Sequence, residues 1–90
     1  MMKEQDIQRS IIKYLEGRGY YVVKIVSASK RGVPDILACG PDGRFVAIEV
    51  KLPGKVPSKL QQFNLDRIRE AGGIAFAATS VDDVKKALDL

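Results

Sequence analysis

The stretch from Pro34 to Lys51, PDILACGPDGRFVAIEVK, decides the fold of this chain. Two runs rich in apolar and β-branched residues, Pro34–Cys39 and Phe45–Lys51, flank the tetrapeptide Gly40-Pro41-Asp42-Gly43. Short apolar runs on either side of a Gly/Pro/Asp turn are typical of a β-hairpin. The stretch therefore predicts two antiparallel strands joined by a tight turn.

The turn sequence also predicts how the two strands pair. In a type I turn Pro41 supplies the fixed φ of the second position, and Gly43 can adopt the positive φ of a short loop that closes with a glycine bulge. This register places Asp35 directly opposite Glu49, with Lys51 on the same face one step further along. A strict two-residue turn would instead move Asp35 to the other face of the sheet.

The opposed carboxylates connect this register to function. Directly opposite positions on one sheet face hold their Cβ atoms about 4.5–5.5 Å apart, and like charges there are destabilising. Lys51 can neutralise Asp35 and Glu49, and so can a divalent cation with hard oxygen ligands, alone or together with the lysine. A Glu-x-Lys strand end by itself is more often a surface ion pair, but a Pro-Asp pair at hairpin distance favours a chemical site.

Further elements extend outward from the hairpin in both directions. Helical spacing of apolar residues, β-branched runs and Ser-initiated caps predict a helix over Lys3–Gly17, a strand over Tyr20–Ser27, a loop over Ala28–Gly32, a second loop over Leu52–Pro57, a helix from Ser58 to about Ala71, a strand over Ile74–Thr79 and a helix from Ser80 to Leu88. The order is αβββαβα, and the helix between the third and fourth strands requires a crossover. The predicted fold class is therefore α/β, a mixed four-stranded sheet with helices covering its faces.

Composition limits the size of the protein and its chemistry. The 90 residues predict one domain over 1–90, and 46% apolar with 29% charged residues is in the ordinary globular range. The single cysteine, Cys39, and the absence of histidine exclude an intramolecular disulfide, the usual zinc and haem sites, and a histidine general base. Any metal must be bound by oxygen, which leaves magnesium, calcium or manganese.

The charge balance and the lack of long apolar stretches indicate the kind of partner. The formal net charge of +4 favours an anionic partner. No apolar stretch is long enough for a membrane span, and the opening MMKEQD lacks the apolar core of a signal peptide. We therefore expect an intracellular, cytoplasmic protein with no membrane partner. Tyr20 and Tyr21 are expected to be one core and one surface residue and are assigned no role.

Pro34-Asp35 followed by Glu49-Val50-Lys51 has the form of the PD-(D/E)XK nuclease motif, and αβββαβα is the restriction-endonuclease-like core of that superfamily. Within it, the chain resembles the VRR-NUC domain, in the compact stand-alone form found in phages and bacteria. The matching features run along almost the whole chain: Glu4, Gly32-Val33-Pro34-Asp35, Ile48-Glu49-Val50-Lys51, and Ser58 through Gly73 with Gln61 at the family's glutamine position.

This resemblance implies hydrolysis of a phosphodiester with Mg²⁺ or Mn²⁺ and without a nucleotide cofactor. Asp35 and Glu49, with the backbone carbonyl of Val50, would hold the metal. Lys51 would orient the attacking water and stabilise charge on the phosphate, while the metal lowers the pKa of the water. A chain without histidine suits this chemistry, because water activated by a metal needs no side-chain base.

Two further catalytic residues are implied, and each has a structural alternative. Glu4 lies at the N-terminal end of the apolar stripe of the first helix and points inward, but a glutamate in a first turn also stabilises the helix dipole. Gln61 matches the family's site glutamine, and it also forms the far half of a capping box with Ser58.

The predicted DNA-binding residues are Lys30, Arg31 and Gly32, which directly precede the Asp35 motif and could grip phosphates beside the metal. The alternative is a solvated loop. Weaker candidates are Lys24, Arg44, Lys55 and Lys59. Contacts of this kind are independent of base sequence and sensitive to salt.

The leading hypothesis is a metal-dependent, structure-selective DNA endonuclease that acts on four-way (Holliday) junctions or other branched DNA, as in DNA repair. A two-fold symmetric junction suits a homodimer with two active sites. The resemblance to phage forms extends the expectation to a phage-encoded protein that acts in a bacterial host. Two alternatives stay open: a non-catalytic nucleic-acid-binding module on the same fold, and a small interaction protein whose charges are only structural.

Overall fold

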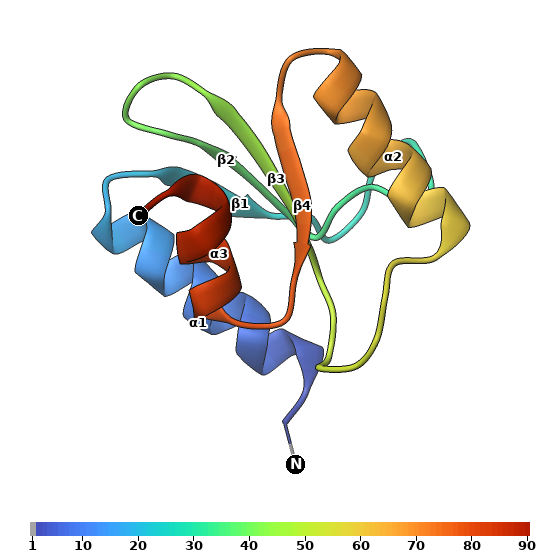
Figure 1. Cartoon of the computed structure of the whole chain (residues 1–90), viewed down its shortest axis with the longest axis horizontal. Helices are drawn as coiled ribbons and strands as arrows, with labels where there is room; N and C mark the ends of the chain where they lie inside the picture. The colour runs from blue at the N-terminus through green and yellow to red at the C-terminus, as the bar shows by residue number, and fades with distance from the viewer. Residues whose placement is uncertain (1) are drawn as a thin grey trace.

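The computed structural model describes residues 2–90, so Met1, with which the predicted unit starts, lies outside the described residues. Its elements are α1 (Glu4–Gly17), β1 (Tyr21–Lys24), β2 (Ile36–Cys39), β3 (Phe45–Val50), α2 (Lys59–Glu70), β4 (Ile74–Ala78) and α3 (Val81–Leu88), as Figure 1 shows. The predicted order and the α/β fold class are confirmed. None of the helices in this part of the chain is long and apolar enough to cross a membrane.

The four strands form one mixed sheet in the order β1-β2-β3-β4. The first two pairings are antiparallel and β3 pairs with β4 in parallel, so α2 serves as the crossover between them. A parallel pair requires such a long connection, because its second strand must start at the same end of the sheet as its first. The carboxyl ends of β3 and β4 therefore lie at the same end of the sheet.

The bulged hairpin register is confirmed. The Gly43 N–H donates to the Gly40 carbonyl over 2.8 Å, and the Gly40 N–H donates to the Arg44 carbonyl over 2.9 Å. Gly43 has φ +85°, the left-handed conformation that a glycine adopts without steric cost. Cys39 pairs with Phe45 along the ladder. The two-residue turn is therefore excluded, and Asp35 lies on the same face as Glu49.

The helices form layers on both sides of the sheet. In Figure 1, α1 and α3 lie on the left of the sheet and α2 on the right. The core on the α1 and α3 side is built from Ile7, Ile11, Leu15, Ile36, Ala38, Val46, Ile48, Val50, Ala78, Val84 and Leu88. The smaller core under α2 consists of Ala47, Leu65 and Ala75, with Leu37 and Ile68 packed against it. Alternate residues of β3 thus point into different cores, as the pleat of a strand requires.

The predicted serine caps of α2 and α3 are present. The Ser58 Oγ accepts from the Gln61 N–H, and the Ser80 Oγ accepts from the Asp83 N–H, both over 3.2 Å. Each bond satisfies one of the free N–H groups of a helix start. The first helix begins one residue later than predicted, with the Lys3 N–H donating to the Asp6 carboxylate over 3.0 Å.

The prediction for the first strand is wrong at its carboxyl end. The strand ends at Lys24 rather than Ser27, because its partner β2 begins only at Ile36, opposite Lys24. Helices flank the sheet as predicted, but α2 packs beside β3 and β4 and leaves apolar side chains of β1 and β2 uncovered on its side. Tyr21 is 73% exposed and Phe45 46% exposed on this uncovered face.

Candidate active site

Asp35 is held in place by the strands on both sides of it. It follows the buried Pro34 and directly precedes β2. Its backbone carbonyl accepts from the Ile25 N–H over 2.7 Å, and its Oδ2 accepts from the Val50 N–H over 2.8 Å. The carboxylate is thus fixed against the end of β3, where the hairpin register predicts it.

Glu49 is the neighbouring carboxyl group, and it is only 3% exposed. Burial raises the pKa of Glu49 to about 8, and the charge of Asp35 and a hydrogen bond with it add to the increase. Lys51 opposes this pKa increase, while Glu4 adds to it. Glu49 therefore keeps its proton at neutral pH unless a cation arrives.

Asp35 and Glu49 together fit a hard divalent cation. Two carboxyl groups lie side by side, and ionising both requires positive charge close to them. Within residues 2–90 no three His, Cys, Asp or Glu side chains come close enough to share an ion. The remaining ligands would then be a backbone carbonyl, water or substrate. Val50, whose N–H donates to the Asp35 carboxylate, is the residue whose carbonyl is the candidate ligand.

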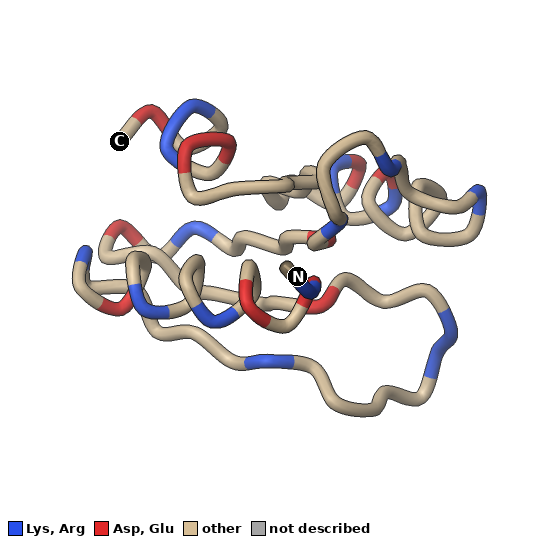
Figure 2. The backbone as a smooth tube through the Cα atoms, turned by 90° about the horizontal axis from the view of Figure 1, so that it is seen from below, with Lys and Arg blue, Asp and Glu red and all other residues tan. Residues whose placement is uncertain are grey.

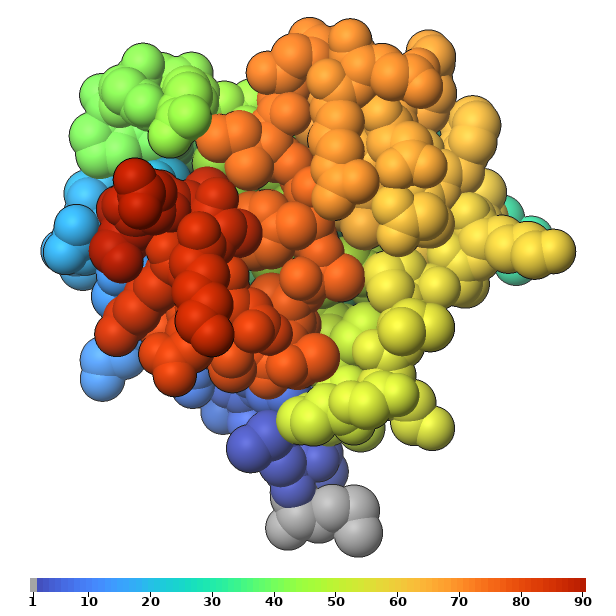
Figure 3. Space-filling view, viewed as in Figure 1, coloured from blue at the N-terminus to red at the C-terminus, as the bar shows by residue number. Residues whose placement is uncertain are grey.

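Lys51 and Glu4 approach the pair from different elements. Lys51 directly follows β3, is half-buried, and its N–H donates to the Ala78 carbonyl of β4 over 3.0 Å. Within the described residues its ammonium forms no salt bridge with Glu49, so it acts on that carboxyl group over a longer distance. Figure 3 shows the segment after β3 next to the N-terminal turn of α1 in this view. The charge of Glu4, in that first turn, adds to the raised pKa of Glu49.

Gln61 has a structural role in this molecule. Its Oε1 accepts from the Ser58 N–H over 2.8 Å, which completes the capping box at the start of α2. The capping interpretation is thus confirmed, and a catalytic role for Gln61 stays a prediction.

The loop between β1 and β2 is docked on α2 through Gly32. Gly32 has φ +76°, and a Cβ at this position would lie 2.7 Å from the Leu60 Cγ. The Asn64 Nδ2 donates to the Arg31 carbonyl over 3.2 Å and fastens the same loop. Sequence reasoning did not find Asn64, because a single polar residue on a helix gives no signal of its partner.

The side chains of Lys30 and Arg31 extend from this docked loop into solvent. Both are exposed, and within residues 2–90 neither pairs with a carboxylate. Figure 2 shows how Lys and Arg (blue) and Asp and Glu (red) are distributed along the backbone. Of the weaker candidates, Arg44 is bound to Asp42 over 2.8 Å, whereas Lys24, Lys55 and Lys59 are exposed.

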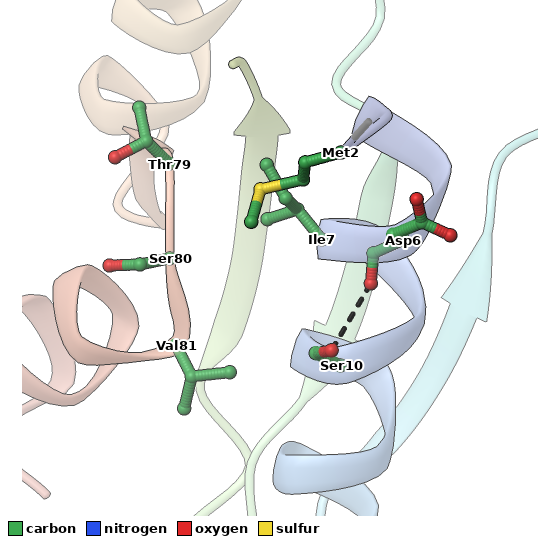
Figure 4. Close-up of a pocket in the computed structure, with 7 residues that line it drawn as sticks. All are labelled: Met2, Asp6, Ile7, Ser10, Thr79, Ser80 and Val81. Atoms are coloured by element: carbon green, nitrogen blue, oxygen red, sulfur yellow. Dashed lines mark hydrogen bonds between the residues drawn. The ribbon is translucent and has the colours of Figure 1, made fainter. Parts of the chain in front are cut away.

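A hollow of about 250 Å³ lies between α1 and the start of α3. Figure 4 shows its lining, Met2, Asp6, Ile7, Ser10, Thr79, Ser80 and Val81. The Ser10 Oγ in its wall donates to the Asp6 carbonyl over 3.1 Å. The hollow contains none of the predicted site residues and has no part in the candidate site.

The fold and the carboxylate pair define a nuclease-type protein of the PD-(D/E)XK class. The family model described as "Archaeal holliday junction resolvase (hjc)" matches residues 2–86. The chain therefore belongs to the archaeal Holliday junction resolvase family. It is also 33% identical over 61 residues to "Putative nuclease p44" of Acyrthosiphon pisum secondary endosymbiont phage 1. That match covers 68% of this chain and 66% of the phage protein.

Solved structures carry the same fold. A structure described as "VRR_NUC domain" superposes with a TM-score of 0.85 at 28% identity, covering 99% of this chain and 97% of the other. A second, described as "VRR_NUC domain protein", has a TM-score of 0.79 at 17% identity and covers 98% and 86%. The resemblance to the VRR-NUC domain is thus confirmed.

Proposed function

We propose that the protein is a divalent-metal-dependent endonuclease that hydrolyses phosphodiester bonds in branched DNA, with four-way junctions as the favoured substrate. The observation that carries this proposal is the buried Glu49 beside Asp35, a pair that a cation would stabilise. The name of the matched family supports DNA junctions as the substrate class.

In this proposal each residue has a defined part. Asp35, Glu49 and the Val50 carbonyl hold Mg²⁺ or Mn²⁺, which when bound lowers the pKa of water and acts as a Lewis acid. Lys51 supplies a positive charge beside the phosphate, which stabilises the negative charge that grows in the transition state. Glu4 adds negative charge at the edge of the site. Lys30 and Arg31, with the backbone at Gly32, hold a neighbouring phosphate.

The test is cleavage of labelled four-way, flap and linear duplex DNA, with and without Mg²⁺ or Mn²⁺. Wild type is expected to cut branched DNA only with metal, and Asp35→Ala to be inactive. Asp82→Ala, which removes an exposed carboxylate from α3, is the matched control and is expected to cut like wild type. Equal behaviour of wild type and Asp35→Ala on every substrate would contradict the proposal and favour a binding module without turnover.

We further propose that two copies associate through the uncovered sheet face. Tyr21, Val23, Leu37, Cys39 and Phe45 line an apolar depression on this face, which carries no charged lining residue. A second copy would remove this apolar surface from water, and a two-fold pair would present two active sites to a junction. Sedimentation is expected to give a dimer for wild type and a monomer for Phe45→Asp. A monomeric wild type at working concentration would contradict this part of the proposal.

A further inference from the structure

The loop between β1 and β2 carries the predicted phosphate-binding cations but has few attachments to the rest of the molecule. It is closed at its base, where the Ile25 N–H donates to the Asp35 carbonyl over 2.7 Å. Within the described part of the chain, one hydrogen bond joins residues 26–34 to another segment: the Asn64 Nδ2 of α2 donates to the Arg31 carbonyl over 3.2 Å. Figure 1 shows this loop (teal) passing behind α2. Asn64 is therefore the polar attachment that holds the loop on α2.

The Asn64 side chain is itself held in one orientation. Besides Arg31, its Nδ2 donates to the Leu60 carbonyl, one turn back in α2, over 3.0 Å. An amide nitrogen carries two hydrogens, and these two acceptors match them. Asparagine is less favourable than leucine or glutamine inside a helix, so helix propensity does not account for this residue.

The backbone packs closely at the same contact. A Cβ at Gly32 would lie 2.9 Å from the Asn64 Nδ2, so glycine is needed for the loop to lie this near to α2. Three residues later the chain reaches Asp35, whose Oδ2 accepts from the Val50 N–H over 2.8 Å. The segment from Arg31 to Asp35 is thus held at both ends, by α2 at Arg31 and by β3 at Asp35.

This held segment sets the spacing between two places where DNA is expected to contact the protein. Lys30 and Arg31 are exposed and would bind one phosphate, while Asp35 and Glu49 would hold the metal at the phosphate that is cut. Reacting groups must be placed closely, since a misplacement of about 1 Å can lower a rate by about 10²-fold. Without its attachment the loop would still present both cations to DNA, but not at a fixed distance from the metal.

We propose that Asn64 is a positioning residue of the nuclease site, whose amide holds the Arg31 carbonyl on α2 and thereby fixes the Lys30 and Arg31 cations relative to the carboxylate pair. This inference rests on the proposed metal-dependent function. It extends the site to a residue of α2 that acts through the loop.

The test compares wild type with Asn64→Leu, which has nearly the same shape and no donor. The single-turnover rate of junction cleavage at saturating DNA with Mn²⁺ is expected to fall by about 10–100-fold. Junction affinity, measured in the inactive Asp35→Ala background, is expected to fall by a smaller factor. Calorimetry should give an unchanged Mn²⁺ affinity, and the melting temperature should be the same or higher, because leucine is the better helix former.

Two further variants separate positioning from a general effect on α2. Gln62→Leu removes an amide that donates to Asp66 of the same helix over 2.9 Å, and it is the control expected to leave all four quantities at the values of wild type or higher in melting temperature. Gly32→Ala adds a Cβ that forces the loop away from α2. This variant is expected to lower the cleavage rate as Asn64→Leu does and to leave the Mn²⁺ affinity unchanged.

The outcomes separate this inference from the proposed function. If wild type cuts junctions and Asn64→Leu cuts them equally fast, the bond only fastens a loop and the inference is wrong, whereas the proposed function stands. A loss of rate accompanied by a lower Mn²⁺ affinity or a lower melting temperature would show a structural role and also contradict the inference. If wild type does not cut with Mn²⁺, the proposed function fails and this inference fails with it. Should Asn64→Leu not fold, Asn64→Ala is measured against the same criteria of rate and Mn²⁺ affinity.

Discussion

Glu49 lies near the carboxyl end of β3, and Asp83 lies in α3, just beyond the carboxyl end of the adjacent parallel strand β4. Folding shifts the pKa values of these two carboxyl groups in opposite directions. Hydrogen bonds from Thr79 lower the pKa of Asp83: its Oδ2 accepts from the Thr79 N–H over 2.8 Å and from the Thr79 hydroxyl over 2.9 Å. Burial and the charge of Asp35 raise the pKa of Glu49.

The difference separates a structural carboxylate from a functional one. Asp83 receives donors from the chain itself and ties the start of α3 to the end of β4. Glu49 lies beside another acid instead, an arrangement that a protein keeps when an external charge completes it. The comparison can be tested with matched variants at the two carboxylates.

The largest difference is expected between the lysines beside the two carboxylates. Lys51→Ala is expected to lower the rate of DNA cleavage by about 10²–10³-fold, because a charge that stabilises the transition state is lost. Mn²⁺ affinity should be retained. Lys86→Ala, which removes the lysine near Asp83, is expected to leave the cleavage rate unchanged. Loss of Mn²⁺ binding in Lys51→Ala would mean that this lysine serves the metal site rather than the phosphate.

The second difference concerns pH and the free energy of unfolding without metal. Between about pH 4.5 and 8 folded Glu49 holds a proton that the unfolded chain has released, so stability falls as pH rises. The slope is at most about 1.4 kcal/mol per pH unit for one such group. Urea titrations in EDTA are expected to show this decrease in wild type and a smaller one in Glu49→Gln. Identical pH profiles would show that Glu49 is not protonated in the folded protein.

Asp83 is expected to change the pH dependence of stability in the opposite direction to Glu49, and by a smaller amount. Its pKa is lowered on folding, so its contribution to stability is present above about pH 3.8 and is lost as pH falls below that value. Asp83→Asn is expected to lower the stability at pH 7 by about 1 kcal/mol, since charge-assisted hydrogen bonds to Thr79 are weakened. Thermal melting at pH 7 measures this effect. An unchanged or higher melting temperature would show that the Asp83 carboxylate does not stabilise the fold and would contradict its structural role.

The smallest expected effect is on the salt dependence of DNA binding. Lys30→Ala and Arg31→Ala are each expected to reduce the slope of log affinity against log salt by about 0.9, as for one phosphate contact. Lys85→Ala in α3 should not change the slope. Binding of inactive Asp35→Ala to junction DNA over a salt series measures these slopes. A change in slope for Lys85→Ala alone would place the DNA on the other side of the molecule.

The hairpin shows how much of the fold could be predicted from the sequence. The conformational limits of Pro41 and Gly43 act within four residues, so the turn type, the register and the opposition of Asp35 and Glu49 follow from local chemistry. The serine caps of α2 and α3 could be predicted for the same reason.

The features that were missed depend on contacts between distant segments. Nothing near Gln8 in the sequence indicates that its amide oxygen is buried without a partner, since that depends on how α1 packs on the sheet. The docking of Gly32 under Asn64 joins residues far apart in the chain. The uncovered face beside Tyr21 likewise depends on where α2 lies relative to β1 and β2.

The central claim is that Asp35 and Glu49 form a site for a divalent cation. Anomalous diffraction from crystals soaked in Mn²⁺ tests it most directly. We expect a single strong peak in contact with carboxylate oxygens of both residues, and no such peak in crystals of Glu49→Gln. A map with no peak between these two side chains, or with manganese bound only at other carboxylates such as Asp83, would contradict the claim.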